Sequence, residues 1–301
     1  MDVLRQTRRS YQPPTAALGK SGHVSCSGNL ACPVCGEPLA DAGRSARCPA
    51  GHSFDYARSG YLNLVRRSDG RGRTGDTAAM VQARAELLAM GHYERIAAAV
   101  AAAAAGASGA GPALVAEVGS GTGHYLDAVA RALRERGAEP ECAFGFDLSK
   151  AAAAHASRRH PSLRFVVADV ETAIPLRDGA AGLVLSVFSP RPGPELSRVI
   201  RVGGELIVAF AGPRHLEALR EREGLMDVHD DKHERLTARL EPWFEPLSST
   251  AVEYQLEFSG KDVGRLVAMG PNAWHDAGST PTGGALSDLV SVVVARFRRS
   301  A

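Results

Sequence analysis

The chain has 301 residues, of which 45% are hydrophobic, and its formal net charge is +2. That length allows one large domain or two small ones, and that hydrophobic fraction fits an ordinary soluble core. No apolar run reaches the roughly 18 to 20 residues of a membrane span, and no leucine-rich segment follows the early arginines. The five cysteines, an odd number with three clustered, argue against a disulfide framework and for a reduced compartment. We therefore expect a cytoplasmic protein with no membrane contact.

Composition divides the chain into four regions. Residues 1–30, rich in Pro, Gly and Ser, are expected to form a disordered tail. Residues 31–65 form a small unit rich in Cys and His, which we interpret as a zinc-binding module. Residues 66–110 combine a basic linker with helices, and residues 111–301 alternate strand and helix patterns.

Four residues of the small unit have the spacing of a zinc site, Cys32-x2-Cys35-x12-Cys48-x3-His52. Three thiolates and one imidazole complete a closed tetrahedral site, so the predicted zinc is structural and not catalytic. A unit of about 35 residues buries too little apolar surface to fold without the stabilisation that a bound metal ion provides. Cys26 could replace His52 as a ligand, although its gap of five residues fits a knuckle poorly.

Four arginines follow the zinc-binding module, at Arg66, Arg67, Arg71 and Arg73, with Asp69 as the only acid among them. A solvated linker explains them adequately. The sharper interpretation is an arm that contacts RNA phosphates.

Two helices are predicted after this arm. The first begins with Asp76 as N-cap and ends near Gly91, and the second runs from about Tyr93 to Ala105. The stretch Met80–Leu88 is apolar enough to form a partner surface in a homodimer, and the oligomeric state stays open.

The remaining domain is predicted as α/β with a mostly parallel, seven-stranded sheet. Short apolar strands that alternate with helices indicate a parallel sheet covered on both faces. Two late strands with a short connection predict an antiparallel pair at the sheet edge. The expected strands are Leu114–Val118, Ala143–Phe146, Arg164–Val167, Leu183–Val187, Glu205–Phe210, Val252–Phe258 and Asp288–Phe297. The expected helices between them are Tyr125–Arg136, Lys150–Arg159 and Pro194–Ile200.

A glycine-rich turn with Gly119, Gly121 and Gly123 follows the first of these strands, where a backbone can approach a ligand closely. Asp147 ends the second strand, where an acid can bind ribose hydroxyls of either NAD or S-adenosyl-L-methionine. Asp169 ends the third strand, a position that suits an adenine amino group. Together these strand ends favour a class I, Rossmann-like methyltransferase over ordinary turns and helix caps in a doubly wound sheet.

The segment Phe188-Ser189-Pro190 follows the fourth strand, where a methyltransferase places its acceptor base. Phe188 could stack on that base, and a backbone carbonyl could accept a hydrogen bond from it. The alternative is a turn that merely ends the strand. No general base can be named from the sequence.

Seven short motifs occur in order between residue 31 and about residue 275. They are Cys32-Pro-x-Cys, Cys48-Pro-x-x-His-Ser-Phe-Asp, Gly60-Tyr-Leu-Asn-Leu64, Gln82-Ala-Arg84, Gly91-His-Tyr93, Gly119-x-Gly-x-Gly-x-Tyr125 and Gly212-Pro-Arg-His-Leu216. In this order they resemble the bacterial large-subunit rRNA guanine-N1-methyltransferases. Glu117 and Ser120 depart from that family, which often has Asp and Cys there, but both keep the strand end and the small turn residue.

The resemblance implies methylation of N1 of a guanine in a 23S rRNA hairpin loop, with S-adenosyl-L-methionine as methyl donor. It implies cofactor contacts at Tyr93, Tyr125, Leu126 and His215, and zinc ligands at the four positions named above. N1 must lose its proton and the base must be splayed out, as hairpin loops allow. Two alternatives remain, a small-molecule methyltransferase and a non-catalytic zinc RNA-binding protein. The choice of guanine, and a housekeeping or a macrolide-resistance role, stay open.

Overall fold

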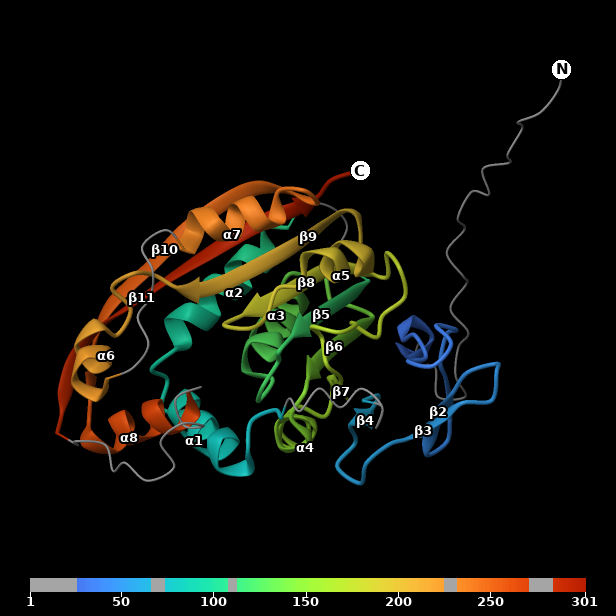
Figure 1. Ribbon diagram of the computed structural model, residues 1–301, viewed down its shortest axis with the longest axis horizontal. Helices are drawn as coiled ribbons and strands as arrows, with labels where there is room; N and C mark the ends of the chain where they lie inside the picture. The colour runs from blue at the N-terminus through green and yellow to red at the C-terminus, as the bar shows by residue number, and fades with distance from the viewer. Residues whose placement is uncertain (1–25, 66–73, 108–112, 225–231, 271–283) are drawn as a thin grey trace, which may run out of the picture.

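Two sheets organise the part of the chain that the computed structural model describes, residues 26–65, 74–107, 113–224, 232–270 and 284–301. The smaller sheet is antiparallel, has the order β1-β2-β3 and follows a short 3-10 helix. Its elements are η1 (Cys26–Asn29), β1 (Ala40–Ala42), β2 (Ser45–Arg47) and β3 (Ser53–Asp55). These elements belong to the zinc-binding module, which lies at one end of the molecule in Figure 1.

The larger sheet has eight strands in the order β10-β11-β9-β8-β5-β6-β7-β4. The strands from β9 to β4 pair in parallel, and β10 and β11 add antiparallel pairs at the other edge. The strands are β4 (Leu62–Asn63), β5 (Leu114–Val118), β6 (Cys142–Asp147), β7 (Arg164–Val167), β8 (Ala181–Val187), β9 (Ile200–Ala211), β10 (Phe244–Phe258) and β11 (Leu286–Arg299).

Helices lie between most of these strands; α3, α4 and α5 stand where the pattern predicts them, and α6, α7 and α8 were not predicted. They are α1 (Ala78–Ala89), α2 (Glu94–Ala105), α3 (His124–Glu135), α4 (Lys150–Arg159), α5 (Gly193–Val199), α6 (Glu217–Glu223), α7 (Lys232–Leu240) and α8 (Gly260–Met269). None of the helices in the described ranges is long and apolar enough to cross a bilayer.

The central strands bury both faces of the sheet, which explains their nearly continuous apolar sequences. Successive residues of β9 alternate between two cores: Ile207 and Ala209 pack with α2, α3 and α8, whereas Leu206, Val208 and Phe210 pack with α5 and α7. The period of two along a strand produces this alternation.

Several sequence-based expectations need correction. The sheet has eight strands instead of seven, because Leu62 of the zinc-binding module pairs in parallel with Val166 on β7. The connection between β10 and β11 is not short, since it contains α8. The N-cap of α1 is Thr77, whose hydroxyl accepts from the Met80 N–H at 3.3 Å, and not Asp76, whose carboxylate is ion-paired.

The expected disordered tail does not extend to residue 30. The segment from Cys26 onward is folded, and a disulfide joins Cys26 to Cys142, with their Cα atoms 5.6 Å apart. Leu30 also forms an antiparallel bridge with Leu176. The two cysteines are 116 residues apart in the sequence, so only the tertiary structure reveals that they meet. This pairing removes Cys26 as an alternative zinc ligand.

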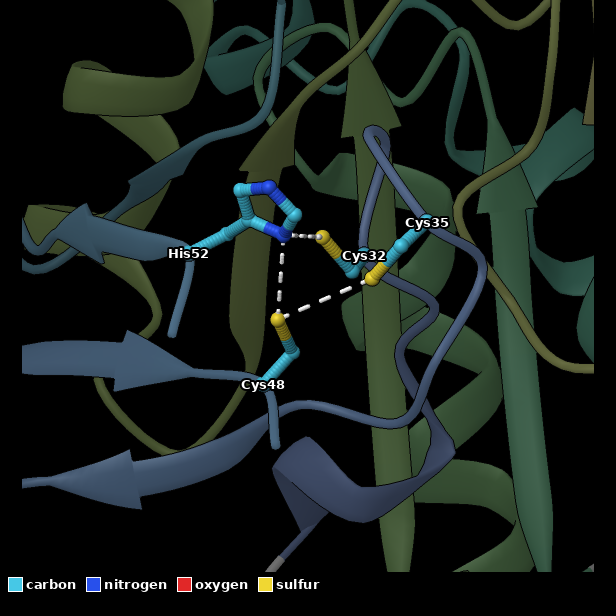
Figure 2. A group of neighbouring side chains, drawn as sticks. All are labelled: Cys32, Cys35, Cys48 and His52. Carbon is cyan, nitrogen blue, oxygen red and sulfur yellow. Dashed lines mark hydrogen bonds between the residues drawn. The ribbon is translucent and has the colours of Figure 1, made fainter. Parts of the chain in front are cut away.

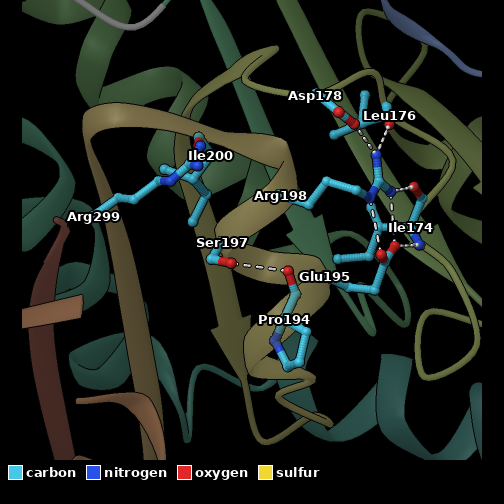
Figure 3. Close-up of polar contacts among 9 residues, drawn as sticks. All are labelled: Ile174, Leu176, Asp178, Pro194, Glu195, Ser197, Arg198, Ile200 and Arg299. Carbon is cyan, nitrogen blue, oxygen red and sulfur yellow. Dashed lines mark hydrogen bonds and ion pairs between the residues drawn. The ribbon is translucent and has the colours of Figure 1, made fainter. Parts of the chain in front are cut away.

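Arg198 on α5 fixes the segment on which the zinc-binding module docks (Figure 3). Its guanidinium donates to the carbonyls of Ile174 and Leu176 at 2.7 and 2.8 Å. The same group pairs with Glu195 and Asp178. Backbone hydrogen bonds from this segment to the module then join the two parts, as in the Ala31 N–H bond to the Pro175 carbonyl at 3.1 Å.

The apolar stretch Met80–Leu88 is used inside the chain. Met80, Leu87 and Leu88 on α1 are buried, and α1 packs against α8. This stretch is therefore not a free surface for a second copy.

Candidate active site

The zinc ligands expected from the spacing come together in the described part of the chain. Cys32, Cys35, Cys48 and His52 place one ligand atom each within 4.8 Å of all the others (Figure 2). Cys32 and Cys35 lie on the first knuckle, and Cys48 and His52 flank the turn between β2 and β3. The Val34 N–H donates to Cys32 Sγ at 3.5 Å, as a knuckle turn that directs its sulfurs inward would provide.

The distances fit a tetrahedral zinc ion. Cys35 Sγ and Cys48 Sγ are 3.7 Å apart, and His52 Nδ1 lies 3.3 Å from Cys48 Sγ and 3.6 Å from Cys32 Sγ. Bonds of about 2.3 Å to sulfur and about 2.0 Å to nitrogen give tetrahedral edges of about 3.5 to 3.8 Å. Because protein atoms occupy all four corners, no position remains for water or substrate, and the site is structural.

A separate cavity of about 490 Å³ opens at the carboxyl ends of β5 and β8. These two strands are neighbours, and the chain leaves β5 towards β6 and leaves β8 towards β9, on opposite sides. Such a reversal in strand order is where open α/β sheets bind their ligands. The volume is within the range of small-molecule and cofactor sites.

The glycine-rich turn forms one wall of this cavity. Gly119, Gly121 and Gly123 have φ values of 66°, 51° and 79°, a region that side chains rarely adopt. The Gly121 N–H donates to Asp147 Oδ2 at 2.8 Å, and the Ser149 N–H donates to Asp147 Oδ1 at 2.8 Å. Asp147 thus fixes the shape of the glycine-rich turn through these two backbone hydrogen bonds. Burial raises the pKa of this carboxyl group, and the two backbone donors oppose the shift.

Four rings gather at the cavity, from residues far apart in the sequence. The Phe188 ring lies 6.2 Å from that of His215, at an interplanar angle of 28°, and 6.4 Å from those of Tyr93 and Tyr125. His215 is held by the Ser291 N–H, which donates to its Nδ1 at 3.2 Å. Aromatic faces attract cations such as a sulfonium and stack on nucleobases. Tyr93, Tyr125 and His215 line the cavity, and cofactor contact by these three residues stays a prediction.

The segment Phe188-Ser189-Pro190 lies beside the glycine turn, and its Phe188 and Ser189 line the cavity. Phe188 has a φ of 50°, unusual for a bulky residue, and the residue is 42% exposed. The Phe188 N–H donates to the Ala209 carbonyl at 2.9 Å, and the Ser189 hydroxyl donates to the Val118 carbonyl at 2.6 Å. Strained backbone of this kind is concentrated at functional sites. Pro190 completes the turn and is exposed.

Other expected residues lie elsewhere. Asp169 accepts from the Glu171 N–H at 3.1 Å and lines a second cavity, beside Cys32 and Val34 of the zinc-binding module. The Leu126 side chain is fully buried and does not line the 490 Å³ cavity. Adenine binding by Asp169 and cofactor contact by Leu126 stay predictions. The four arginines Arg66, Arg67, Arg71 and Arg73 lie outside the described residues.

The cavity also contains residues that the sequence did not single out as site residues. Arg84 on α1 pairs with Asp76, donates to the Met269 carbonyl at 2.8 Å and lies against Gly121. Its only signal was its place in the Gln82-Ala-Arg84 motif. Arg191 and His124 also line the cavity, with no motif to mark them.

A parallel sheet with a glycine turn at β5, an acid at the end of β6 and a cavity at the strand-order reversal defines a class I methyltransferase. Residues 115–204 match the family model described as a methyltransferase domain. Residues 30–66 match the zinc ribbon described as RlmA, N-terminal. S-Adenosyl-L-methionine is therefore the cofactor. The Cys3His cluster of the zinc ribbon is a separate, structural zinc site.

Two relatives identify the family. The chain is 44% identical over 247 residues to a 23S rRNA (guanine(748)-N(1))-methyltransferase of Streptomyces fradiae. The aligned region covers 82% of this chain and 86% of that protein. It is 41% identical over 293 residues to a putative 23S rRNA (guanine-N(1)-)-methyltransferase of Micromonospora griseorubida. That alignment covers 91% of this chain and 97% of the relative. The chain belongs to the 23S rRNA guanine-N1-methyltransferase family.

Proposed function

We propose that this protein transfers a methyl group from S-adenosyl-L-methionine to N1 of a guanine in a hairpin loop of 23S rRNA. We further propose that this guanine is the counterpart of guanine 748, the position given in the name of the Streptomyces fradiae relative. The observation that carries the proposal is that the glycine turn and the Phe188–Pro190 turn line the same cavity. A methyl donor held by one turn would face a base held by the other.

The chemistry needs little besides position and a proton acceptor. The cofactor, when bound, supplies a methyl group on a positively charged sulfur. N1 of guanine would lose its proton to water, and the electron pair on N1 would then take the methyl group, with the electrons of the old bond left on the donor sulfur. The protein contributes by orienting the base in line with the methyl group.

Access to N1 requires an unpaired base, because Watson–Crick pairing covers that atom. The exposed face of Phe188, together with Tyr93 and His215, supplies rings on which such a base can stack. Stacking of this kind is worth about 1 to 3 kcal/mol per base. The stacked base also carries its Watson–Crick edge into the cavity.

The zinc-binding module and the arm Arg66, Arg67, Arg71 and Arg73 would contact the RNA backbone in this proposal. Contacts with the RNA backbone fix the register and orientation of the protein on the RNA, whereas contacts in the cavity recognise the base. The site of action would be the cytoplasm, where rRNA is modified. A homodimer would have to use a surface other than Met80–Leu88, and light scattering would detect it.

The test is methyl transfer from labelled S-adenosyl-L-methionine to a 23S rRNA hairpin that contains the loop guanine. Primer extension locates the product, because a methyl group at N1 blocks pairing and stops the polymerase. The matched control replaces that one guanine with adenine. Label in the guanine hairpin alone supports the proposal. Label in a small metabolite, or in another position of the hairpin, contradicts it.

A further inference from the structure

Arg191 is a cation that lines the cavity directly after the Phe188–Pro190 turn, where the acceptor base is proposed to bind. Its guanidinium carbon lies 5.9 Å from the centroid of the Phe210 ring. Its Nη2 reaches the Ala209 carbonyl at 3.5 Å, the outer limit of a hydrogen bond. The side chain lines the same cavity as Gly119 and His215.

The charge of Arg191 has no partner in the described part of the chain. Its Nε is buried without a hydrogen-bond acceptor, and among the described residues no carboxylate is paired with it. Burial lowers its pKa to about 10, and Arg239 adds to the effect by repulsion. Arg84 and Arg198, by contrast, are both ion-paired with acids. A buried arginine normally has such a partner, because an isolated buried charge is costly.

Within the described ranges, the residues that line the cavity offer no acid to Arg191. They include Arg84, Arg191 and Arg220 but neither Asp nor Glu. The missing partner should therefore come with a ligand and should carry negative charge or a strong acceptor.

Position selects the acceptor base over the cofactor as that partner. Arg191 comes three residues after Phe188 at the end of β8, whereas the glycine turn and Asp147 belong to β5 and β6. The planar fork of arginine is the commonest specific partner of guanine, through O6 and N7. Adenine presents an amino group where guanine has O6, and a guanidinium cannot accept from it.

We propose that Arg191 binds O6 of the guanine that is methylated and thereby both selects guanine and favours loss of its N1 proton. This inference rests on the proposed function. When N1 loses its proton, the negative charge is shared with O6. A positive donor already placed at O6 stabilises that charge without reorganisation. The proton itself leaves to water, and Arg191 keeps all of its own.

The test compares Arg191→Met, Arg191→Lys and the control Arg201→Met, which removes an exposed arginine at the opposite end of β9. Hairpin affinity is measured with guanine, or with 2-aminopurine, which lacks O6, at the target position. The wild type and the control should prefer guanine by about tenfold, as one good base contact provides. Arg191→Met should lose that preference, and Arg191→Lys should keep part of it. The double-mutant cycle measures the coupling of Arg191 with the O6 and N1 edge of the guanine.

The pH profile of methyl transfer supplies a second readout. With Arg191→Met, the rate should keep rising to higher pH than in the wild type, because N1 no longer loses its proton as readily. Affinity for S-adenosyl-L-methionine should be unchanged. An Arg191→Met protein that still prefers guanine, or one that has lost cofactor affinity, overturns the inference. A wild type that methylates no guanine in the hairpin would instead overturn the proposed function.

Discussion

A β-carbon added to Gly119 would lie only 2.4 Å from the β-carbon of Ser189. The glycine turn, proposed to bind the cofactor, and the Phe188–Pro190 turn, proposed to receive the base, are therefore packed against each other. The Ser189 hydroxyl strengthens the contact by donating to the Val118 carbonyl at 2.6 Å. This closeness arises because β5 and β8 are neighbours in the sheet and both turns follow their carboxyl ends. The two turns are thereby held at a fixed spacing.

Gly119→Ala should disrupt this contact. Gly137→Ala is the matched control, because Gly119 and Gly137 have similar φ values, 66° and 71°, but only Gly119 has a neighbour within 4 Å. Backbone strain should cost both variants roughly 1 to 3 kcal/mol in the free energy of unfolding. Gly119→Ala should lose more, and should also bind S-adenosyl-L-methionine at least about tenfold more weakly. Denaturation and calorimetric titration measure the two effects, and equal behaviour of the variants would contradict the packing argument.

One zinc ion per chain is expected, and Cys48→Ala should lose it. Cys26→Ala is the control, because Cys26 is paired with Cys142 and lies outside the ligand cluster. Elemental analysis of the purified variants gives the stoichiometry. Removal of zinc should also unfold the module, since metal binding supplies much of the folding free energy of such units. Retention of zinc by Cys48→Ala, or its loss from Cys26→Ala, would show that the ligand set is wrong.

Asp147→Ala should weaken the binding of S-adenosyl-L-methionine by about tenfold or more, since charge-assisted hydrogen bonds contribute about 1.5 to 3 kcal/mol. The variant loses two backbone hydrogen bonds that shape the turn, besides any contact with ribose. Asp178→Ala removes an exposed acid away from the cavity and should bind the cofactor normally. Calorimetric titration distinguishes the two, and unchanged affinity in Asp147→Ala would exclude this acid from the site.

Glu117→Gln should stabilise the cofactor-free protein at neutral pH more than at acidic pH. Burial raises the pKa of Glu117 well above its ordinary value, while the Leu126 N–H donates to its Oε2 at 3.1 Å. Below the unfolded pKa, both states hold the proton and the glutamate costs nothing. As pH rises towards the folded pKa, the unfolded state releases the proton first, so stability falls. Gln keeps the acceptor and removes this dependence. Thermal melts at pH 4 and pH 8 measure it, and an equal difference between the two proteins at both values would contradict the shift.

Changing Arg66, Arg67, Arg71 and Arg73 together to Ala should weaken hairpin binding without changing which base is methylated. Each lost phosphate contact should remove about one ion from the slope of log affinity against log salt. Affinity for S-adenosyl-L-methionine should stay the same. Filter binding at several salt concentrations measures the slope. If the segment is only a tether, the slope will not change.

The sequence alone determined the features that depend on local pattern. The spacing of Cys32, Cys35, Cys48 and His52 predicted a ligand cluster that the fold assembles. The strands β5 and β7 were predicted with their observed bounds, because short apolar runs between turns have few alternatives. The glycine turn was equally visible, since its residues are adjacent in the chain and their backbone freedom is intrinsic.

Only the tertiary structure decided which distant residues meet. Cys26 pairs with Cys142, Leu62 adds a strand beside β7, and Phe188 joins His215, through contacts that no local period encodes. Arg191 shows the limit most plainly. An arginine after a strand is ordinary in a sequence, and only the packed structure shows that its Nε is buried without an acceptor and that no acid in the described part of the chain pairs with it. Burial and pairing are properties of the packed chain, because they depend on what the rest of the fold places around a side chain.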